Sequence, residues 1–296
     1  MRIVTRPDLD GVVCAVLLYE AEPIVLPVRW IEPEDIQKGR AGIEKDDILA
    51  NLPYDPNCLM WFDHHFTNRI DTPFRGAFRI APSAAGIVYD YYNNAIKKNF
   101  DELVAHTDRI DSADLTREEV LRPQDNPYVL LSMTISGRNK ADEYYWNLVV
   151  DLLRKHPIAE VMKNEDVARR AKAVIETNER FAAHLKNCTR VEGQVAVSDF
   201  RSLDKNPQGN RFLVYCLYPE CVVSIRVAIS DDDGEKVRIN AGHSIFNKNC
   251  NVNVGKLMSM FGGGGHNGAG ACSFHVSQAE NNIAEIVKIL KKNEPI

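Results

Sequence analysis

The chain has 296 residues, of which 45% are hydrophobic and 26% charged, and this composition excludes an intrinsically disordered protein. Its formal net charge is −5, so no global positive field favours long duplex DNA as a partner. No apolar run approaches the roughly 20 residues of a membrane-spanning helix, so no membrane association is expected. Scattered cysteines and early acidic residues argue against a disulfide framework and a signal peptide, and a cytoplasmic location is predicted.

Strands and helices alternate in the first part of the chain. Strands are predicted over residues 1–4, 24–28, 46–51 and 58–62, and helices over residues 12–20 and 83–98. Such alternation predicts a parallel α/β sheet, in which ligands bind beyond the carboxyl ends of the strands. The polar segments that follow these strands are therefore expected to meet at one edge of the sheet.

The remainder of the chain predicts a helical region and a second α/β domain. Residues 100–186 are mostly helical in pattern, with one long helix over residues 159–186. In the second domain, strands are predicted over 194–200, 221–230 and 236–242, and helices over 210–218, over 254–260 and at the C-terminus. We predict a first domain over residues 1–155, a helical linker over 156–189 and a smaller second domain over 190–296.

Carboxylates and histidines follow the predicted strands. Asp8 and Asp10 lie in the turn after the first strand, Asp63-His64-His65 ends the apolar run at 58–62, and Asp108 and Asp111 follow a helical segment. Oxygen and imidazole ligands of this kind suit Mn²⁺ or Mg²⁺ better than a structural zinc ion. An Asp-x-Asp-Gly segment alone is typical of a turn, but its combination with Asp-His-His at strand ends favours a metal site.

Three segments carry a resemblance to a known family. The segments TRPDLDG (5–11), FDHH (62–65) and GGGGH (262–266) resemble the DHH phosphoesterase superfamily, and the exopolyphosphatase-related proteins within it. That superfamily also includes manganese-dependent inorganic pyrophosphatases, single-strand exonucleases and oligoribonucleotide hydrolases. The resemblance covers nearly the whole chain and implies a parallel-sheet DHH domain, a long helix, and a smaller C-terminal DHH-associated α/β domain that binds substrate.

The resemblance also implies roles for particular residues. Asp8 would serve a first metal, and Asp10, His64 and either Asp108 or Asp111 would serve a second. Catalytic or orienting roles fall on Asp63 and His65. In the C-terminal domain, the implied substrate-binding residues are Arg226, Gly262, Gly263, Gly264, Gly265 and His266. One or two Mn²⁺ or Mg²⁺ ions are the implied cofactors.

Two positions depart from the family pattern. Arg6 occupies the position of a metal-binding histidine, and Asn51 occupies that of a bridging aspartate in the metal-ligand set. An arginine side chain stays protonated in proteins and does not bind a cation. Exchanging His for Arg and Asp for Asn adds two positive charges, which equals the charge of one missing dication. The hypothesis is that the Arg6 guanidinium, held by Asp8, takes the place of the first metal and binds a phosphoryl oxygen.

These observations predict a metal-dependent phosphohydrolase acting on a phosphoanhydride or a short phosphodiester in a cleft between the two domains. Its substrate would be a phosphate-containing small molecule or a short oligonucleotide, cleaved in an exopolyphosphatase-like or oligonucleotide phosphodiesterase-like reaction. Water activated by the metal would attack phosphorus, with Asp63 and His65 beside it. The alternative is a catalytically degenerate protein that binds a nucleotide or phosphate. A nucleic-acid-binding exonuclease and a homodimer are further options that the sequence leaves open.

Overall fold

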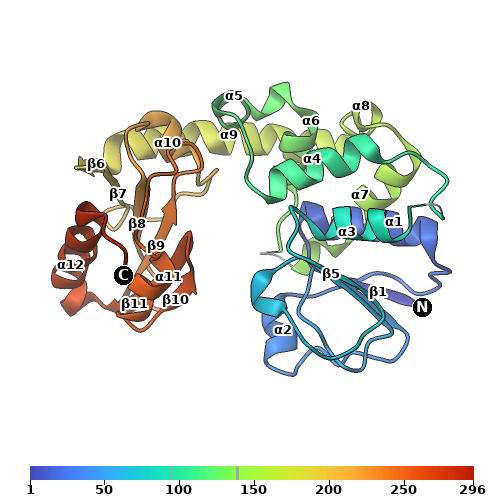
Figure 1. Cartoon of the computed structure of the whole chain (residues 1–296). Coiled ribbons are helices and arrows are strands. Elements are labelled where there is room, and N and C mark those ends of the chain that lie inside the picture. The colour runs from blue at the N-terminus through green and yellow to red at the C-terminus, as the bar shows by residue number, and fades with distance from the viewer. Residues whose placement is uncertain (94, 138–139) are drawn as a thin grey trace. The chain divides into compact units, whose positions relative to one another are not determined.

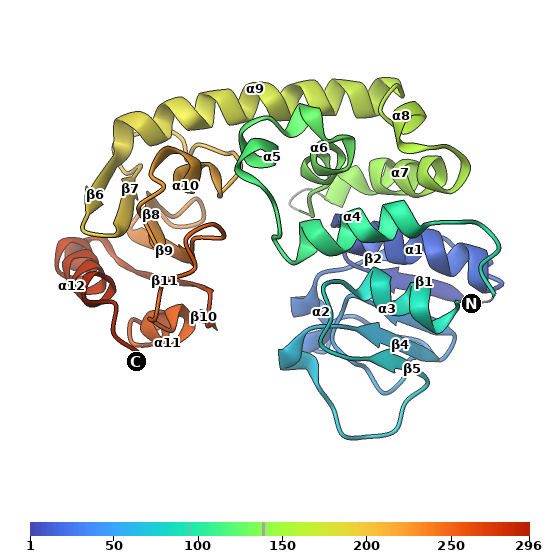
Figure 2. The ribbon, with the colours of Figure 1, turned by 45° about the horizontal axis from the view of Figure 1, so that its top comes forward.

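The computed structural model describes residues 1–93, 95–137 and 140–296, and the chain divides into two units (Figure 1). The first unit comprises residues 1–115 and 123–174, and the second comprises residues 116–122 and 175–296. The division falls inside one long helix, α9 (Glu165–Cys188), which is continuous along its length (Figure 2). The domain limits given above from the sequence stay a prediction.

The first unit contains a five-stranded sheet in the order β2-β1-β3-β4-β5, and every neighbouring pair is parallel. The predicted parallel α/β sheet is therefore confirmed. Its strands are β1 (Arg2–Thr5), β2 (Arg29–Trp30), β3 (Asp47–Ala50), β4 (Met60–Asp63) and β5 (Gly76–Phe78). Its helices are α1 (Leu9–Ala21), α2 (Pro33–Gln37), α3 (Ala84–Tyr91), α4 (Asp101–Asp111), α6 (Pro127–Thr134), α7 (Glu143–Lys155), α8 (Ile158–Val161) and the start of α9, with short 3-10 segments at Phe66–Asn68, Pro123–Asp125 and Lys140–Asp142.

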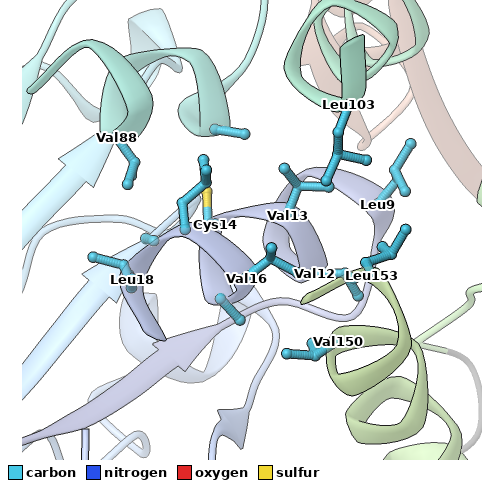
Figure 3. Packing of buried hydrophobic residues seen from close by; sticks show 14 of the residues in the cluster. Leu9, Val12, Val13, Cys14, Val16, Leu18, Val88, Leu103, Val150 and Leu153 are labelled. Atoms are coloured by element: carbon cyan, nitrogen blue, oxygen red, sulfur yellow. The ribbon is translucent and has the colours of Figure 1, made fainter. Parts of the chain in front are cut away.

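Helix α1 lies at the centre of the first unit. Ten consecutive residues from Leu9 to Leu18 are buried, so this helix is covered on all sides rather than amphipathic. Figure 3 shows Val13 beside Leu103 of α4, and Val12 near Val150 of α7. Because the helix is enclosed, the polar residues at its N-terminus are held firmly at the carboxyl edge of the sheet.

The second unit is built on a mixed sheet in the order β10-β11-β9-β8-β7-β6, in which only β7 and β8 are parallel among the described strands. One face packs against α11 and α12 in a single hydrophobic core. Its strands are β6 (Thr189–Glu192), β7 (Val195–Asp199), β8 (Val223–Ile229), β9 (Lys236–His243), β10 (Gly264–His266) and β11 (Ala269–His275). Its helices are α5 (Arg117–Leu121), the end of α9, α10 (Leu213–Leu217), α11 (Val254–Ser259) and α12 (Ala279–Lys292), with a 3-10 turn at Val276–Gln278. The second expected α/β unit is thus present.

Several predicted elements differ from the structure. No strand forms over residues 24–28, because Pro27 lacks the N–H that a sheet ladder requires, and pairing begins only at Arg29. The helix expected over 159–186 is interrupted, since the Asn164 side chain accepts hydrogen bonds from the Asp166 and Val167 amides and starts α9 afresh. Helix α3 ends at Tyr91, so the helix expected over 83–98 is too long; residue 94 lies outside the described residues. The helix expected over 210–218 is only the five residues of α10.

Among the described residues, every helix is too short or too polar to cross a lipid bilayer.

Candidate functional site

Asp10 joins the N-termini of α1 and α3. Its side chain is buried, with Oδ2 accepting a hydrogen bond from the Ala84 amide at 2.9 Å and Oδ1 accepting one from the Ala85 amide at 2.7 Å. Burial and, after it, the negative charge of Asp8 raise the pKa of the Asp10 carboxyl to about 7, although the two backbone donors act to lower it. The site therefore contains a buried carboxylate that gains from a nearby positive charge.

His64 directs a bare ring nitrogen toward two carboxylates. Its Nδ1 lies 2.9 Å from the Ala81 carbonyl oxygen, which can only accept, so Nδ1 donates this hydrogen bond and Nε2 is the ring nitrogen left for a ligand. Nε2 lies 3.3 Å from Oδ2 of Asp111 and 3.8 Å from Oδ2 of Asp10. It is buried without a hydrogen-bond partner within the described part of the chain. An imidazole nitrogen that faces two carboxylates fits a divalent cation.

Asp111 and Asp108, both on α4, have different surroundings. Asp111 lies with Asp10 and His64 in a group whose potential ligand atoms are all within 4.8 Å of one another. Burial and, after it, the negative charge of Asp10 raise the pKa of the Asp111 carboxyl to about 7. By contrast, Oδ1 of Asp108 accepts a hydrogen bond at 2.5 Å from Ser83, the residue that caps α3. Of the two residues that the sequence left open, geometry brings Asp111 to the cluster.

Asp63 orients His65. The Asp63 side chain is buried at the end of β4, where Oδ1 lies 2.8 Å from Nδ1 of His65 and Oδ2 accepts a hydrogen bond at 2.7 Å from Asn68. The hydrogen bond to Asp63 raises the pKa of the His65 ring. Because Nδ1 is engaged, Nε2 of this half-exposed ring is the nitrogen that remains for a ligand or a proton. The His64 and His65 ring centroids lie 4.1 Å apart.

Arg6 and Asn51 surround the carboxylate of Asp8. Nε of Arg6 lies 2.9 Å from Oδ2 of Asp8, and Nδ2 of Asn51 donates to Oδ1 at 3.0 Å. The backbone amide of Gly11 donates to the same Oδ1 at 2.8 Å as part of the N-cap of α1. Asn51 is buried with a φ of 57°, a left-handed conformation that asparagine tolerates. Both oxygens of Asp8 are thus engaged by donors of this protein.

The glycine run at 262–265 is part of a hairpin. Gly264–His266 form β10, which pairs antiparallel with β11, and the exposed His266 is opposite Ala269. A Cβ on Gly263 would lie 2.0 Å from the Ala271 oxygen, whereas one on Gly264 would meet no atom within 4 Å. The close approach of the two strands therefore requires glycine at some of these positions. Gly262 has a positive φ of 75°, which also favours glycine.

Arg226 lies on the face of the second sheet opposite to α11 and α12. Its guanidinium donates to the Pro207 carbonyl oxygen and lies over the rings of Phe181 and Phe200, 5.6 Å and 5.2 Å from their centroids. These contacts fix the side chain among aromatic residues. The substrate-binding roles expected for Arg226, for His266 and for the glycines stay predictions.

Comparison with known proteins identifies the family. No family model matches the sequence, and none of the curated proteins matches it. Among solved structures, the chain is similar to "pGpG-specific phosphodiesterase - PggH" from Vibrio cholerae, with 30% identity, a TM-score of 0.85 and coverage of 99% of both chains. The chain belongs to the DHH phosphoesterase superfamily. The expected fold and the expected enzyme class, a phosphoesterase, are thereby confirmed.

More distant members of the DHH superfamily share the fold. An exopolyphosphatase-related protein from Bacteroides fragilis is 13% identical with a TM-score of 0.56, and the match covers 98% of this chain and 92% of that one. RecJ from Thermus thermophilus, in complex with Mn²⁺, is 14% identical with a TM-score of 0.60, and the match covers all of this chain and 53% of that one. At such identities the likeness concerns architecture alone.

The sequence did not reveal the hydrogen-bond partners of three predicted site residues, His64, Asp108 and Asp63. The Ala81 carbonyl sets the tautomer of His64, Ser83 holds Asp108, and Asn68 holds Asp63. Ser83 carried a signal, because a serine that precedes a helical pattern is a common N-cap. A backbone carbonyl and an asparagine in a loop carry no comparable signal, since their roles arise only when β4 and β5 lie side by side.

Proposed function

We propose that this protein is a divalent-metal-dependent phosphodiesterase that cleaves a short, phosphorylated dinucleotide of the pGpG type. The observation that carries the metal requirement is the bare, buried Nε2 of His64 between the carboxylates of Asp10 and Asp111. The substrate class is supported by full-length similarity to a structure described as a pGpG-specific phosphodiesterase.

The residues of the cluster suit distinct tasks in such a reaction. Asp10, Asp111 and Nε2 of His64 would hold Mn²⁺ or Mg²⁺ by two oxygens and one nitrogen. When bound, the cation would lower the pKa of a water molecule and polarise a phosphoryl oxygen. The pair of Asp63 and His65 positions one imidazole nitrogen to hold or donate a proton. Water adds to phosphorus, one bridging P–O bond breaks, and two mononucleotides leave.

A second candidate is non-catalytic binding of a nucleotide. It is favoured by Arg6 and Asn51, which depart from the metal ligands of the DHH family. Phosphate contacts by a guanidinium would serve binding as well as catalysis. The two candidates differ in turnover. A phosphodiesterase would hydrolyse a substrate and need Asp10, His64 and Asp111 to do so, whereas a binding protein would hydrolyse none.

Turnover of a substrate panel tests the proposed function. We expect Mn²⁺- or Mg²⁺-dependent hydrolysis of pGpG and related 5′-phosphorylated dinucleotides, with little release from cyclic dinucleotides, phosphoadenosine phosphate, pyrophosphate or polyphosphate. His64→Ala should abolish turnover, whereas His156→Ala, at an exposed histidine of the same unit, should not. Preferred hydrolysis of pyrophosphate or polyphosphate would contradict the substrate class. Binding without turnover of any compound would support the second candidate.

A further inference from the structure

We infer that the active site holds one divalent cation, and that the guanidinium of Arg6 takes the place of a second one and contacts the phosphoryl group. This inference rests on the proposed function. Phosphoesterases with two metals place them about 3.5–4 Å apart and use both on the reacting phosphate. The residues of this chain fit one such ion but not the pair.

Asp8 is the first reason that a second cation does not fit. Its Oδ2 is paired with Nε of Arg6, and its Oδ1 accepts from both the Asn51 side chain and the Gly11 amide. A carboxylate with this set of donors gains little from binding a metal, and the guanidinium occupies the space beside it. Arg6 continues to compete with a cation for Asp8 at any pH that the protein tolerates, since arginine remains positively charged in proteins.

Asn51 is the second reason. Its amide group must face Asp8 with nitrogen, because a carboxylate accepts hydrogen bonds and does not donate them. Its Oδ1 is then a buried oxygen without a hydrogen-bond partner in the described part of the chain. A neutral amide oxygen is a weak ligand and supplies no charge to bridge two dications. Asn51 therefore stabilises the Arg6–Asp8 pair rather than a second metal.

The charges of the cluster agree with one ion. Arg6 balances Asp8, and the two carboxylates that face His64, those of Asp10 and Asp111, match the charge of a single dication. The oxygens of Asp63 are already engaged by His65 and Asn68. A second dication would consequently have no free carboxylate to balance it within this group.

The guanidinium is also placed to bind phosphate. Nε of Arg6 faces Asp8, and Nη2 lies 4.0 Å from Oε2 of Glu32, beyond hydrogen-bond distance. The N–H groups on Nη1 and Nη2 therefore keep donors for a phosphoryl oxygen, and the side chain is one-third exposed. A guanidinium can donate two parallel hydrogen bonds to a phosphate. The ammonium group of a lysine would not reproduce this geometry.

Metal stoichiometry tests this inference without any substrate. We expect one Mn²⁺ per chain in the purified wild-type protein by elemental analysis and titration, with the paramagnetic resonance spectrum of isolated Mn²⁺ ions. The double variant Arg6→His/Asn51→Asp should take up a second ion and show the spectrum of a coupled pair. The matched control Arg40→His/Asn57→Asp, at exposed positions outside the cluster, should keep one ion.

The outcomes separate the inference from the proposed function. Two coupled ions in the wild-type protein, or a single ion in the double variant when circular dichroism shows it folded, would overturn the inference whether or not dinucleotides are hydrolysed. One ion without hydrolysis would contradict only the proposed function. Should the double variant not fold, the number of ions bound by the wild-type protein decides.

The variant Arg6→Lys tests the phosphate role of the guanidinium. It should keep one ion and lose at least about tenfold in kcat/KM, because the bidentate contact is lost. An unchanged kcat/KM would overturn the phosphate role.

Discussion

The Nε2 atom of His64 lies 3.3 Å from Oδ2 of Asp111, whereas Asp108, one helical turn earlier, gives its Oδ1 to Ser83. This difference predicts which aspartate binds the ion. Asp111→Asn should weaken Mn²⁺ binding by roughly 100-fold or more, because a charged ligand becomes neutral. Asp108→Asn can still accept the Ser83 hydrogen bond and should change the affinity by less than about threefold. Calorimetric titration measures both, and the reverse ranking would show that Asp108 is the ligand.

Binding of the cation should release protons below neutral pH. In the ion-free protein, burial raises the pKa of Asp10 and Asp111 to about 7, so each carboxyl holds a proton at lower pH that a metal must displace. Mn²⁺ affinity should then fall as the pH decreases through about 7, by up to tenfold per pH unit for each proton displaced. Titration in buffers of different ionisation enthalpy measures the protons released. Equal release at about pH 6 and pH 8.5 would contradict the prediction.

The same two carboxyls set a pH dependence of stability, with a sign that can be worked out. Their folded pKa lies above the unfolded value, so their favourable contribution is complete below about pH 4 and is lost as the pH rises through about 7. The ion-free protein should therefore lose stability from these groups between about pH 4 and pH 7, and added Mn²⁺ should raise Tm most at the higher pH. Asp10→Asn/Asp111→Asn should remove this extra Mn²⁺ effect.

The sequence was sufficient to predict the parallel sheet and the strands after which the polar residues of the site lie. Short apolar runs such as residues 58–62 are buried on both faces of a parallel sheet, so a polar residue that follows them lies at its edge. In the structure, Asp10 and His64 lie near each other, with Nε2 of His64 3.8 Å from Oδ2 of Asp10. The sequence did not separate Asp108 from Asp111, because the separation depends on Ser83, which is 25 residues from Asp108 and reaches it only in the folded chain.

The errors have local physical causes. Residues 24–28 are rich in valine, leucine and isoleucine, but this propensity is overridden by Pro27, which cannot donate to a ladder. The helix break near Asn164 was missed because asparagine is a modest helix former in a chain segment of strong ones, and its capping role appears only in the structure. The hairpin at Gly264–His266 has no β-branched residues to indicate a strand, and its pairing with β11 comes from backbone contact.

The glycines of this hairpin should differ in their effect on stability. Gly265→Ala places a Cβ 2.3 Å from the Ala269 oxygen at a φ of +152°, so we expect a loss of about 2–4 kcal/mol in the free energy of unfolding. Gly264→Ala meets no atom within 4 Å and should cost less than about 1 kcal/mol. Urea unfolding of both variants measures the difference. Equal stability would show that the close backbone approach at position 265 does not constrain the fold.

Phe66 is predicted to contribute to recognition of a nucleobase. Its side chain is 70% exposed and directly follows His65, and the equally exposed Ile80 precedes Ala81, whose carbonyl holds His64. Stacking of a base on an aromatic ring contributes about 1–3 kcal/mol, so Phe66→Ala should raise KM for a dinucleotide roughly 5-fold to 100-fold with little change in kcat.

Steady-state kinetics and metal titration check this role of Phe66 together. Mn²⁺ affinity should be the same in Phe66→Ala as in the wild-type protein, because the ring supplies no ligand. Phe66→Tyr should keep the wild-type KM, since a tyrosine ring stacks equally well. Tyr144→Ala removes a similarly exposed aromatic ring from α7, a helix that supplies no residue to the cluster of Asp10, His64 and Asp111, and serves as the matched control. A fall in kcat at constant KM would show that Phe66 supports the geometry of His65 instead, because a stacking platform acts on substrate binding before it acts on the chemical step.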